Sequence, residues 1–171
     1  TGSLLIDGGA KVESQTATVG SNVGGTGTVT VSGNGSNWTN TGDFTIARDG
    51  TGTMTVTGDG ATVNSGRLGI GNTASADGTL TLSHAGRWTS TQDALVGAGG
   101  TGKVRIESGG WLTTVGGQVG TAAGSNGTVE INSAAASNKI STWDATTGDI
   151  TGGGAGGTGK ISISEGGNLE A

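Results

Sequence analysis

The sequence predicts an all-β fold, a single-stranded parallel β-helix (solenoid) in which the chain coils into stacked rungs. Three observations predict this class. A glycine anchor recurs about every 25 residues, each anchor opens a segment of alternating apolar and polar residues, and a glycine-containing turn follows that segment. The anchors define about six and a half rungs, and we expect a right-handed coil because parallel crossovers nearly always have that hand. The anchors are Gly2, Gly27, Gly52, Gly78, Gly102, Gly127 and Gly159.

The first predicted strand of each rung begins at its anchor. The second and fourth residues after the anchor are apolar, whereas the residues between them are mostly threonine, serine or charged. Successive side chains of a strand point to opposite faces, so this alternation predicts one buried face and one face in water. The apolar pairs are Leu4/Ile6, Val29/Val31, Met54/Val56, Leu80/Leu82, Val104/Ile106, Val129/Ile131 and Ile161/Ile163.

Two shorter strands complete each predicted rung. A turn with glycine, such as Gly8-Gly9 or Gly86, leads to the second strand, because glycine adopts positive φ without steric cost. The second strand places one apolar residue at equivalent positions, namely Val12, Trp38, Val63, Trp88, Leu112 and Leu169. The third strand carries the pairs Ala17/Val19, Phe44/Ile46, Leu68/Ile70, Ala94/Val96 and Gly117/Val119.

Composition narrows the class of protein. The chain has 171 residues, of which 39 are glycine and 30% are hydrophobic, and it contains no cysteine and no proline. Disulfides and thiolate chemistry are therefore excluded. A net charge of −5 with scattered Lys and Arg disfavours nucleic acid as a partner, and no apolar run has membrane-spanning length. We interpret residues 1–171 as a single β-helix domain, since each rung of a solenoid needs only a few inward apolar residues.

The ends and one rung depart from the regular pattern. Residue 1 precedes an anchor by one position, the chain stops halfway round a rung, and neither end has an amphipathic capping helix. We therefore expect a segment of a longer protein, or a unit that associates end to end through its open edges. The sixth rung is longer than the others, and its extra residues predict a loop insertion within 132–143.

Three stretches carry a family resemblance. Gly25 to Ile46 reads GTGTVTVSGNGSNWTNTGDFTI, Gly50 to Val63 reads GTGTMTVTGDGATV, and Gly78 to Gly97 reads GTLTLSHAGRWTSTQDALVG. These segments resemble the glycine-rich repeat of autotransporter passenger domains and related exported bacterial proteins, the type V secretion and PEP-CTERM-associated repeat. The resemblance implies export, a β-helical rod in the extracellular space or at the outer-membrane surface, and frequent roles in adhesion or biofilm. It brings no catalytic residues to this chain.

Candidate catalytic and metal-binding residues are few. His84, the only histidine, lies in a predicted turn without a nucleophile elbow or oxyanion hole, and we interpret it as a solvated residue. Asp43 and Asp93 occupy equivalent positions two rungs apart, but Arg67 lies between them, which favours a surface stack of alternating charge. The aspartates are too dispersed for the calcium β-roll repeat, and no His or Cys cluster favours a transition metal. We therefore predict no catalytic residue, no bound metal and no cofactor.

The tryptophans divide into inward and outward sets. Trp38 and Trp88 align with core positions, and Trp143 echoes them in the long rung. Trp111 aligns with polar residues instead and should point outward, one rung away from Arg87. Trp111, Arg87 and Lys139 are therefore the candidate surface contacts for a glycan or another protein, although an incidental surface aromatic is the simpler interpretation of Trp111.

A grid of threonines forms the last pattern. Thr28/Thr30, Thr53/Thr55 and Thr79/Thr81 repeat on three rungs, as on ice-binding surfaces, but Lys103/Arg105 and Glu130 interrupt the grid. Threonine also simply suits an exposed strand, which is the interpretation we favour.

These observations together predict a non-enzymatic role. We expect a structural or adhesive rod of a bacterial cell-surface or secreted protein. A self-stacking extracellular fibre subunit is one alternative. A β-helix enzyme acting on polysaccharide is the other, but it needs long loops and clustered acids, bases or metal ligands, whereas this chain has short turns and scattered charges.

Overall fold

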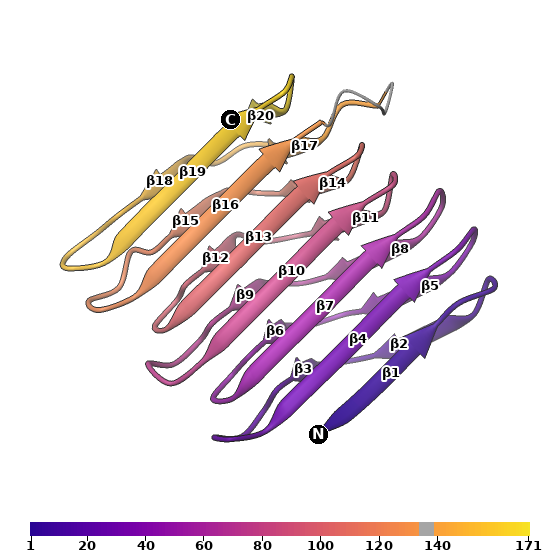
Figure 1. The fold of residues 1–171 in the computed structure, drawn as a ribbon, viewed down its shortest axis with the longest axis horizontal. Coiled ribbons are helices and arrows are strands. Elements are labelled where there is room, and N and C mark those ends of the chain that lie inside the picture. The colour runs from indigo at the N-terminus through magenta and orange to yellow at the C-terminus, as the bar shows by residue number, and fades with distance from the viewer. Residues whose placement is uncertain (134–138) are drawn as a thin grey trace.

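Three parallel β-sheets form the walls of a solenoid in the computed structural model, which describes residues 1–133 and 139–171 (Figure 1). The predicted fold class is confirmed, because every strand pairs in parallel with its counterparts on the adjacent rungs. Sheet A has seven strands in the order β1-β4-β7-β10-β13-β16-β19. Their bounds are Gly2–Ile6, Thr26–Ser32, Thr51–Thr57, Asp77–Ser83, Thr101–Glu107, Asn126–Asn132 and Thr158–Ser164.

Sheets B and C close the rung. Sheet B comprises β2 (Lys11–Ser14), β5 (Asn37–Asn40), β8 (Thr62–Ser65), β11 (Arg87–Ser90), β14 (Trp111–Thr114), β17 (Thr142–Ala145) and β20 (Asn168–Glu170). Sheet C comprises β3 (Ala17–Val19), β6 (Phe44–Ile46), β9 (Leu68–Ile70), β12 (Ala94–Val96), β15 (Gly117–Val119) and β18 (Ile150–Gly152). The described strands thus make six complete rungs and a seventh without its third strand.

The anchor glycines permit close contact at the corner between sheets C and A. They align in one column of sheet A, as in the pairs Gly27↔Gly52 and Gly78↔Gly102. A Cβ atom at Gly102 would collide with the backbone nitrogen of Gly97 and lie 2.7 Å from the carbonyl oxygen of Ile70. The recurring glycine is therefore required because the backbone of the preceding corner leaves no room for a side chain.

The core is built from columns of apolar side chains that run along the axis. In the inner column of sheet B, Val12, Trp38, Val63, Trp88, Leu112, Trp143 and Leu169 pair in register. Trp88 and Trp143 are fully buried and Trp38 nearly so, which confirms the predicted inward set. Large and smaller side chains alternate from rung to rung, so that the layers interlock.

Neighbouring sheets accommodate these bulky rings. Phe44 on β6 lies with its ring centroid 4.8 Å from Trp38 and 4.9 Å from Trp88, edge to face in both cases. On sheet C, the ring of Trp143 occupies the space that a side chain at Gly117 would need. The glycine in the third strand of that rung is therefore a packing partner of the tryptophan.

Each buried indole donates one hydrogen bond to the rung before it. Trp38 Nε1 donates to Ser14 Oγ at 2.9 Å, Trp88 Nε1 to Ser65 Oγ at 3.0 Å, and Trp143 Nε1 to Thr114 Oγ1 at 2.9 Å. In every case the acceptor ends the preceding strand of sheet B. The indole N–H is thereby satisfied inside an apolar core, where an unpaired donor would be costly.

The turn of the fourth rung differs from the glycine pattern. Many of the predicted turn glycines do have positive φ, including Gly8, Gly9, Gly58 and Gly60. Gly86 does not, and the expectation for it was wrong: His84 (φ 49°) and Ala85 (φ 65°) adopt the left-handed conformation instead. Gly86 lies against the backbone of Val56, so it is needed for close approach and not for its φ.

Extra residues separate sheets A and B in the sixth rung. β16 ends at Asn132 and β17 begins at Thr142, in the interval where the insertion was predicted. The loop is tied at its base, where the Ser141 backbone N–H donates to Ser133 Oγ and Ser141 Oγ donates to the Asn132 carbonyl. Residues 134–138 of the predicted insertion lie outside the described residues.

None of the described segments is a helix that could cross a lipid bilayer.

Candidate functional site

The outer face of sheet B brings together two of the three predicted contact residues. Arg87 and Trp111 are registered neighbours on β11 and β14, and the guanidinium carbon lies 5.2 Å from the centroid of the indole ring. Trp111 is half-buried, and its Nε1 donates to Thr113 Oγ1 at 3.1 Å. Trp111 thus points outward as predicted, but Arg87 already covers one face of its ring through a cation–π contact.

Lys139 contacts the turns between sheets A and B. Its aliphatic stem packs where a side chain at Gly109 would stand, in the turn between β13 and β14. Its ammonium lies 3.4 Å from Asp59 Oδ2, in the turn that joins β7 and β8. The Lys139 side chain therefore extends along the turns between sheets A and B and contacts two of them.

The expected charge stack forms only in part. Register places Asp43, Arg67 and Asp93 one position before Phe44, Leu68 and Ala94, as predicted. Arg67 Nη1 forms an ion pair with Asp43 Oδ2 at 4.0 Å, and Arg67 Nη2 donates a hydrogen bond to Gln92 Oε1 at 3.4 Å. Within the part of the chain that the structure describes, Asp93 has no ion pair, and its Oδ1 instead faces Gly116 of the next rung.

A groove lies beside this broken stack, at the edge where sheets B and C meet. Its volume is about 440 Å³, and it is lined by Arg67, Thr91, Gln92, Asp93, Leu95, Val115 and Gln118. The turn Thr91–Gln92–Asp93 is one residue longer than the turns above and below it, Gly66–Arg67 and Val115–Gly116. The longer turn supplies the polar part of the lining, which we call the wall, and the half-buried Leu95 and Val115 supply the apolar part, which we call the floor.

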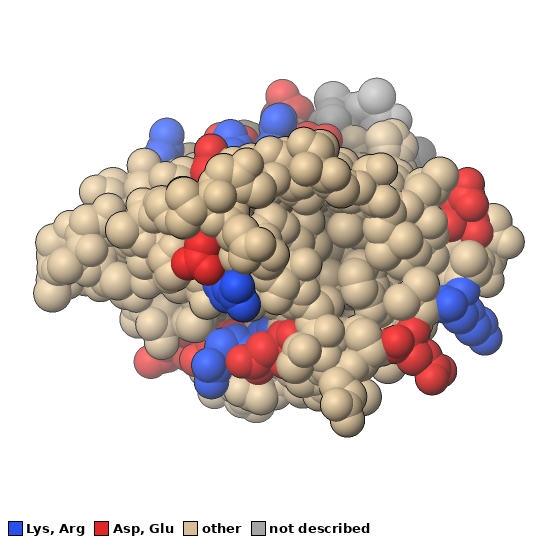
Figure 2. All heavy atoms as spheres, turned by 90° about the horizontal axis from the view of Figure 1, so that it is seen from below, with Lys and Arg blue, Asp and Glu red and all other residues tan. Residues whose placement is uncertain are grey.

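The outer face of sheet A divides into a neutral and a charged half. On β4, β7 and β10 the predicted threonine grid is in register, with Thr28↔Thr53↔Thr79 and Thr30↔Thr55↔Thr81. On β13 and β16, Lys103 and Arg105 both approach Glu130, at 2.9 and 3.6 Å, and Arg105 also lies 3.5 Å from Glu107. Figure 2, which views the molecule from another side, shows a few acidic and basic side chains close together on an otherwise largely uncharged surface.

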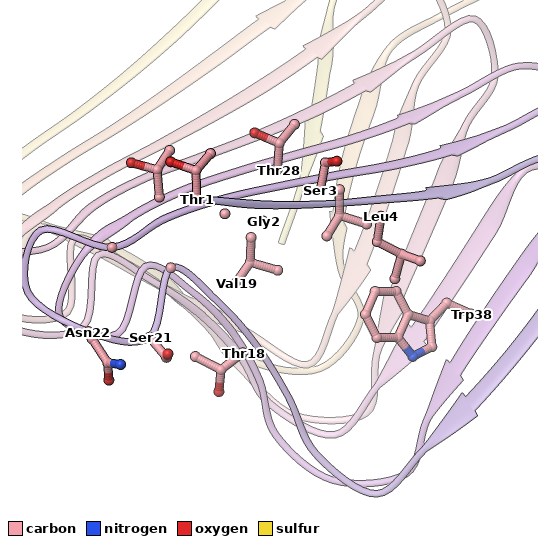
Figure 3. A pocket seen from close by; sticks show the side chains of 15 residues that line it. Thr1, Gly2, Ser3, Leu4, Thr18, Val19, Ser21, Asn22, Thr28 and Trp38 are labelled. Carbon is pink, nitrogen blue, oxygen red and sulfur yellow. The ribbon is translucent and has the colours of Figure 1, made fainter.

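A second depression opens at the first rung and exposes part of the core. Figure 3 shows Leu4 and Val19 pointing into it, with the indole of Trp38 below Leu4. Leu4 belongs to the inner column of sheet A but is 41% exposed, because no rung covers that side of β1. This depression of about 360 Å³ is the open end of the solenoid interior.

The described residues hold the lone histidine and the acidic side chains apart from any metal-binding cluster. His84 is exposed in its turn, and Thr57 Oγ1 lies 3.4 Å from its Nδ1. Within residues 1–133 and 139–171, no group of three or more His, Cys, Asp or Glu side chains is placed to hold a metal ion.

Sequence reasoning missed the floor of the groove. Leu95 occupies an outward position of sheet C, in a column that holds Thr45 and Thr151 on other rungs. An apolar residue at a polar position of an otherwise alternating repeat is the signal that could have found it. Gln118, in the same column, lies on the groove wall.

Comparison of the chain with protein-family models, curated proteins and solved structures found no match.

Proposed function

We propose that this chain is a non-catalytic structural or adhesive rod of a bacterial cell-surface or secreted protein. One observation carries the proposal: successive rungs stack in register on three sheets, with continuous backbone ladders and buried apolar columns along the axis. With a strand spacing of about 4.8 Å, the stack extends for roughly 30 Å. A body held together along its whole length in this way resists bending and can separate other elements in space.

The sequence resemblance to exported passenger repeats supports a location outside the cytoplasm. Short turns and dispersed charges support a role without turnover. The rod would present its outer faces to a glycan or to another protein.

The location is tested on intact cells of the source organism. An antibody against this β-helix should label unpermeabilised cells or the culture medium, and external protease should remove the cell-bound signal. Labelling that requires permeabilisation would contradict the proposal. Purified protein should also release no reducing ends or unsaturated products from a polysaccharide panel, and turnover that disappears in the D43N or D93N variant would establish the enzymatic alternative.

A second candidate function is a self-stacking fibre subunit, in which strands of the first and last rungs of two copies would pair. Extending the observed register places Gly159, Ile161 and Ile163 of one copy against Gly2, Leu4 and Ile6 of the next. Leu4 and Ile163 are 41% and 48% exposed, and such a stack would bury both. Sheet C has one strand fewer than sheets A and B, so the junction would lack a rung on that side.

Electron microscopy of concentrated protein distinguishes the fibre from the single rod. If copies stack, filaments should disappear in the Leu4→Glu variant, which places a charge on the end of the core. The Leu5→Glu variant is the matched control, because Leu5 lies on the outer face and is already 61% exposed. A monomer at all concentrations, or filaments that persist in the Leu4→Glu variant, would reject the fibre.

A further inference from the structure

We propose that the groove between sheets B and C binds an uncharged saccharide. The site is the one lined by Arg67, Gln92, Asp93, Leu95, Val115 and Gln118. It adds a ligand to the rod and does not depend on where the rod is displayed or on whether copies stack. The inference rests on three features of the groove: its shape, its hydrogen-bonding groups and its charge.

The shape fits a sugar ring. A volume of about 440 Å³ lies within the range of roughly 300–1,000 Å³ that is typical of small-ligand sites. Leu95 and Val115 together form a half-buried apolar floor on an outer surface where the repeat otherwise favours polar residues. The C–H face of a pyranose is apolar and can lie on such a floor, whereas its hydroxyl groups point toward the rim.

The rim supplies both donors and acceptors. Arg67 uses only part of its fork on Asp43 and Gln92, and an arginine has five N–H donors. The carboxamide NH₂ of Gln92 remains a donor, because its oxygen is the group that accepts from Arg67. Gln118 likewise accepts from Thr121 through Oε1 and keeps its NH₂ group for a ligand. A sugar hydroxyl donates and accepts at once, so it suits a mixed rim of this kind.

Asp93 is the group that most needs a partner. It is half-buried, and among the described residues its carboxylate has neither an ion pair nor a hydrogen bond. Arg67, which was expected to neutralise it, is engaged by Asp43 and Gln92 instead. A carboxylate can accept from two vicinal hydroxyls at once, one through each oxygen, and hydrogen bonds to an ionised acceptor are the stronger kind.

The charges around the groove favour a neutral ligand. Asp43 and Asp93 would repel a carboxylated or sulfated sugar, and the Arg67 guanidinium would repel a cation. A calcium ion would require six to eight oxygen ligands, and the groove offers a single carboxylate. An uncharged saccharide is repelled neither by the aspartates nor by the guanidinium. Without an aromatic platform in the groove, we expect dissociation constants in the millimolar range.

Chemical-shift titration of the full 171-residue chain tests the inference. The probes are glucose, galactose, mannose and N-acetylglucosamine with their β-linked disaccharides, and glucuronate serves as the anionic comparison. At least one neutral sugar should shift amide signals of residues 91–95 and 115–118, while glucuronate should bind more weakly. Asp93→Ala and Leu95→Thr should each weaken that binding about tenfold or more.

Matched variants separate binding from folding. Leu95→Thr installs the residue that the same column holds at Thr45 and Thr151, so the strand should form normally. Asp149→Ala removes an exposed aspartate from the equivalent turn of the sixth rung and should leave binding unchanged. The inference is overturned if no neutral sugar shifts these signals at saturating concentration, if glucuronate binds there more tightly, or if the groove variants bind like wild type.

Discussion

The central and terminal rungs share one sequence pattern but differ in how their inner side chains are covered. Ile106 on β13 and Ile163 on β19 belong to the same inner column of sheet A, linked through Ile131. Ile106 is fully buried, whereas Ile163 is 48% exposed. The repeat unit therefore does not determine burial by itself. A rung on each side completes the core, as expected for a solenoid in which each repeat contacts only its neighbours.

The largest predicted effect comes from truncating an isoleucine of this column, either on a central rung or on the last rung. Ile106→Ala should lower the free energy of unfolding by about 3–4 kcal/mol, because it removes buried methyl groups and leaves a cavity. Ile163→Ala should cost less than about 1 kcal/mol, since water already reaches that side chain. Urea denaturation followed by circular dichroism measures both. Equal losses would contradict the view that neighbouring rungs complete the core.

A second comparison adds a methyl group to an anchor glycine, either on a central rung or on the first rung. Gly102→Ala should destabilise the chain by about 3 kcal/mol, near the upper end for overpacking, because the new Cβ meets the backbone of Gly97 and Ile70. Gly2→Ala should be nearly neutral, because no atom lies within 4 Å of its Cβ position. Thermal melts of the two variants provide the comparison. A harmless Gly102→Ala substitution would mean that the recurring glycine serves a role other than close approach.

The fold was predictable because the same alternation is repeated on every rung. Strict alternation placed Met54, Leu80 and Val104 inward, and shared spacing aligned them with the columns that the structure shows. Trp143 was placed in the core despite the irregular spacing of its rung, because the glycine and aspartate that follow it repeat an earlier turn. Because each position of the rung occurs several times in the sequence, one irregular residue does not change the predicted pattern.

Interactions that occur once were not predictable in the same way. The left-handed conformations of His84 and Ala85, and the contact of Lys139 with Asp59, depend on how one particular turn is packed. The charge stack failed at Asp93 because Arg67 has a fork that reaches two other partners, Asp43 and Gln92. Register fixes which residues are neighbours, but side-chain rotamers decide which neighbours bond.

A third pair concerns the hydrogen bond of the buried indoles. Ser65→Ala should cost about 1–2 kcal/mol, because it leaves Trp88 Nε1 unpaired in the closed interior. Ser14→Ala also removes the hydrogen bond that Ser14 Oγ donates to Asn40 Oδ1, but it should cost only about 0.5 kcal/mol, since Trp38 borders the open depression at the first rung and water can replace the hydroxyl. Denaturation midpoints and tryptophan fluorescence check both variants. A Ser14→Ala loss as large as that of Ser65→Ala would show that the first rung is closed in solution.

The smallest predicted effect concerns surface charges. Here the loss of stability should depend only on the charged side chains that lie beside the substituted residue. Arg67→Asp stacks a third carboxylate between Asp43 and Asp93 and should destabilise the rod by a few tenths of a kcal/mol, because both members of the original pair are about half exposed. Lys160→Asp on β19 should have no measurable effect, since its registered neighbour is the uncharged Thr128. Melting temperatures at low salt and in 1 M salt, where the Debye length falls to about 3 Å, separate the two cases. The Arg67→Asp loss should vanish at high salt, and a melting temperature that is unchanged even at low salt would mean that the charges on this edge do not interact.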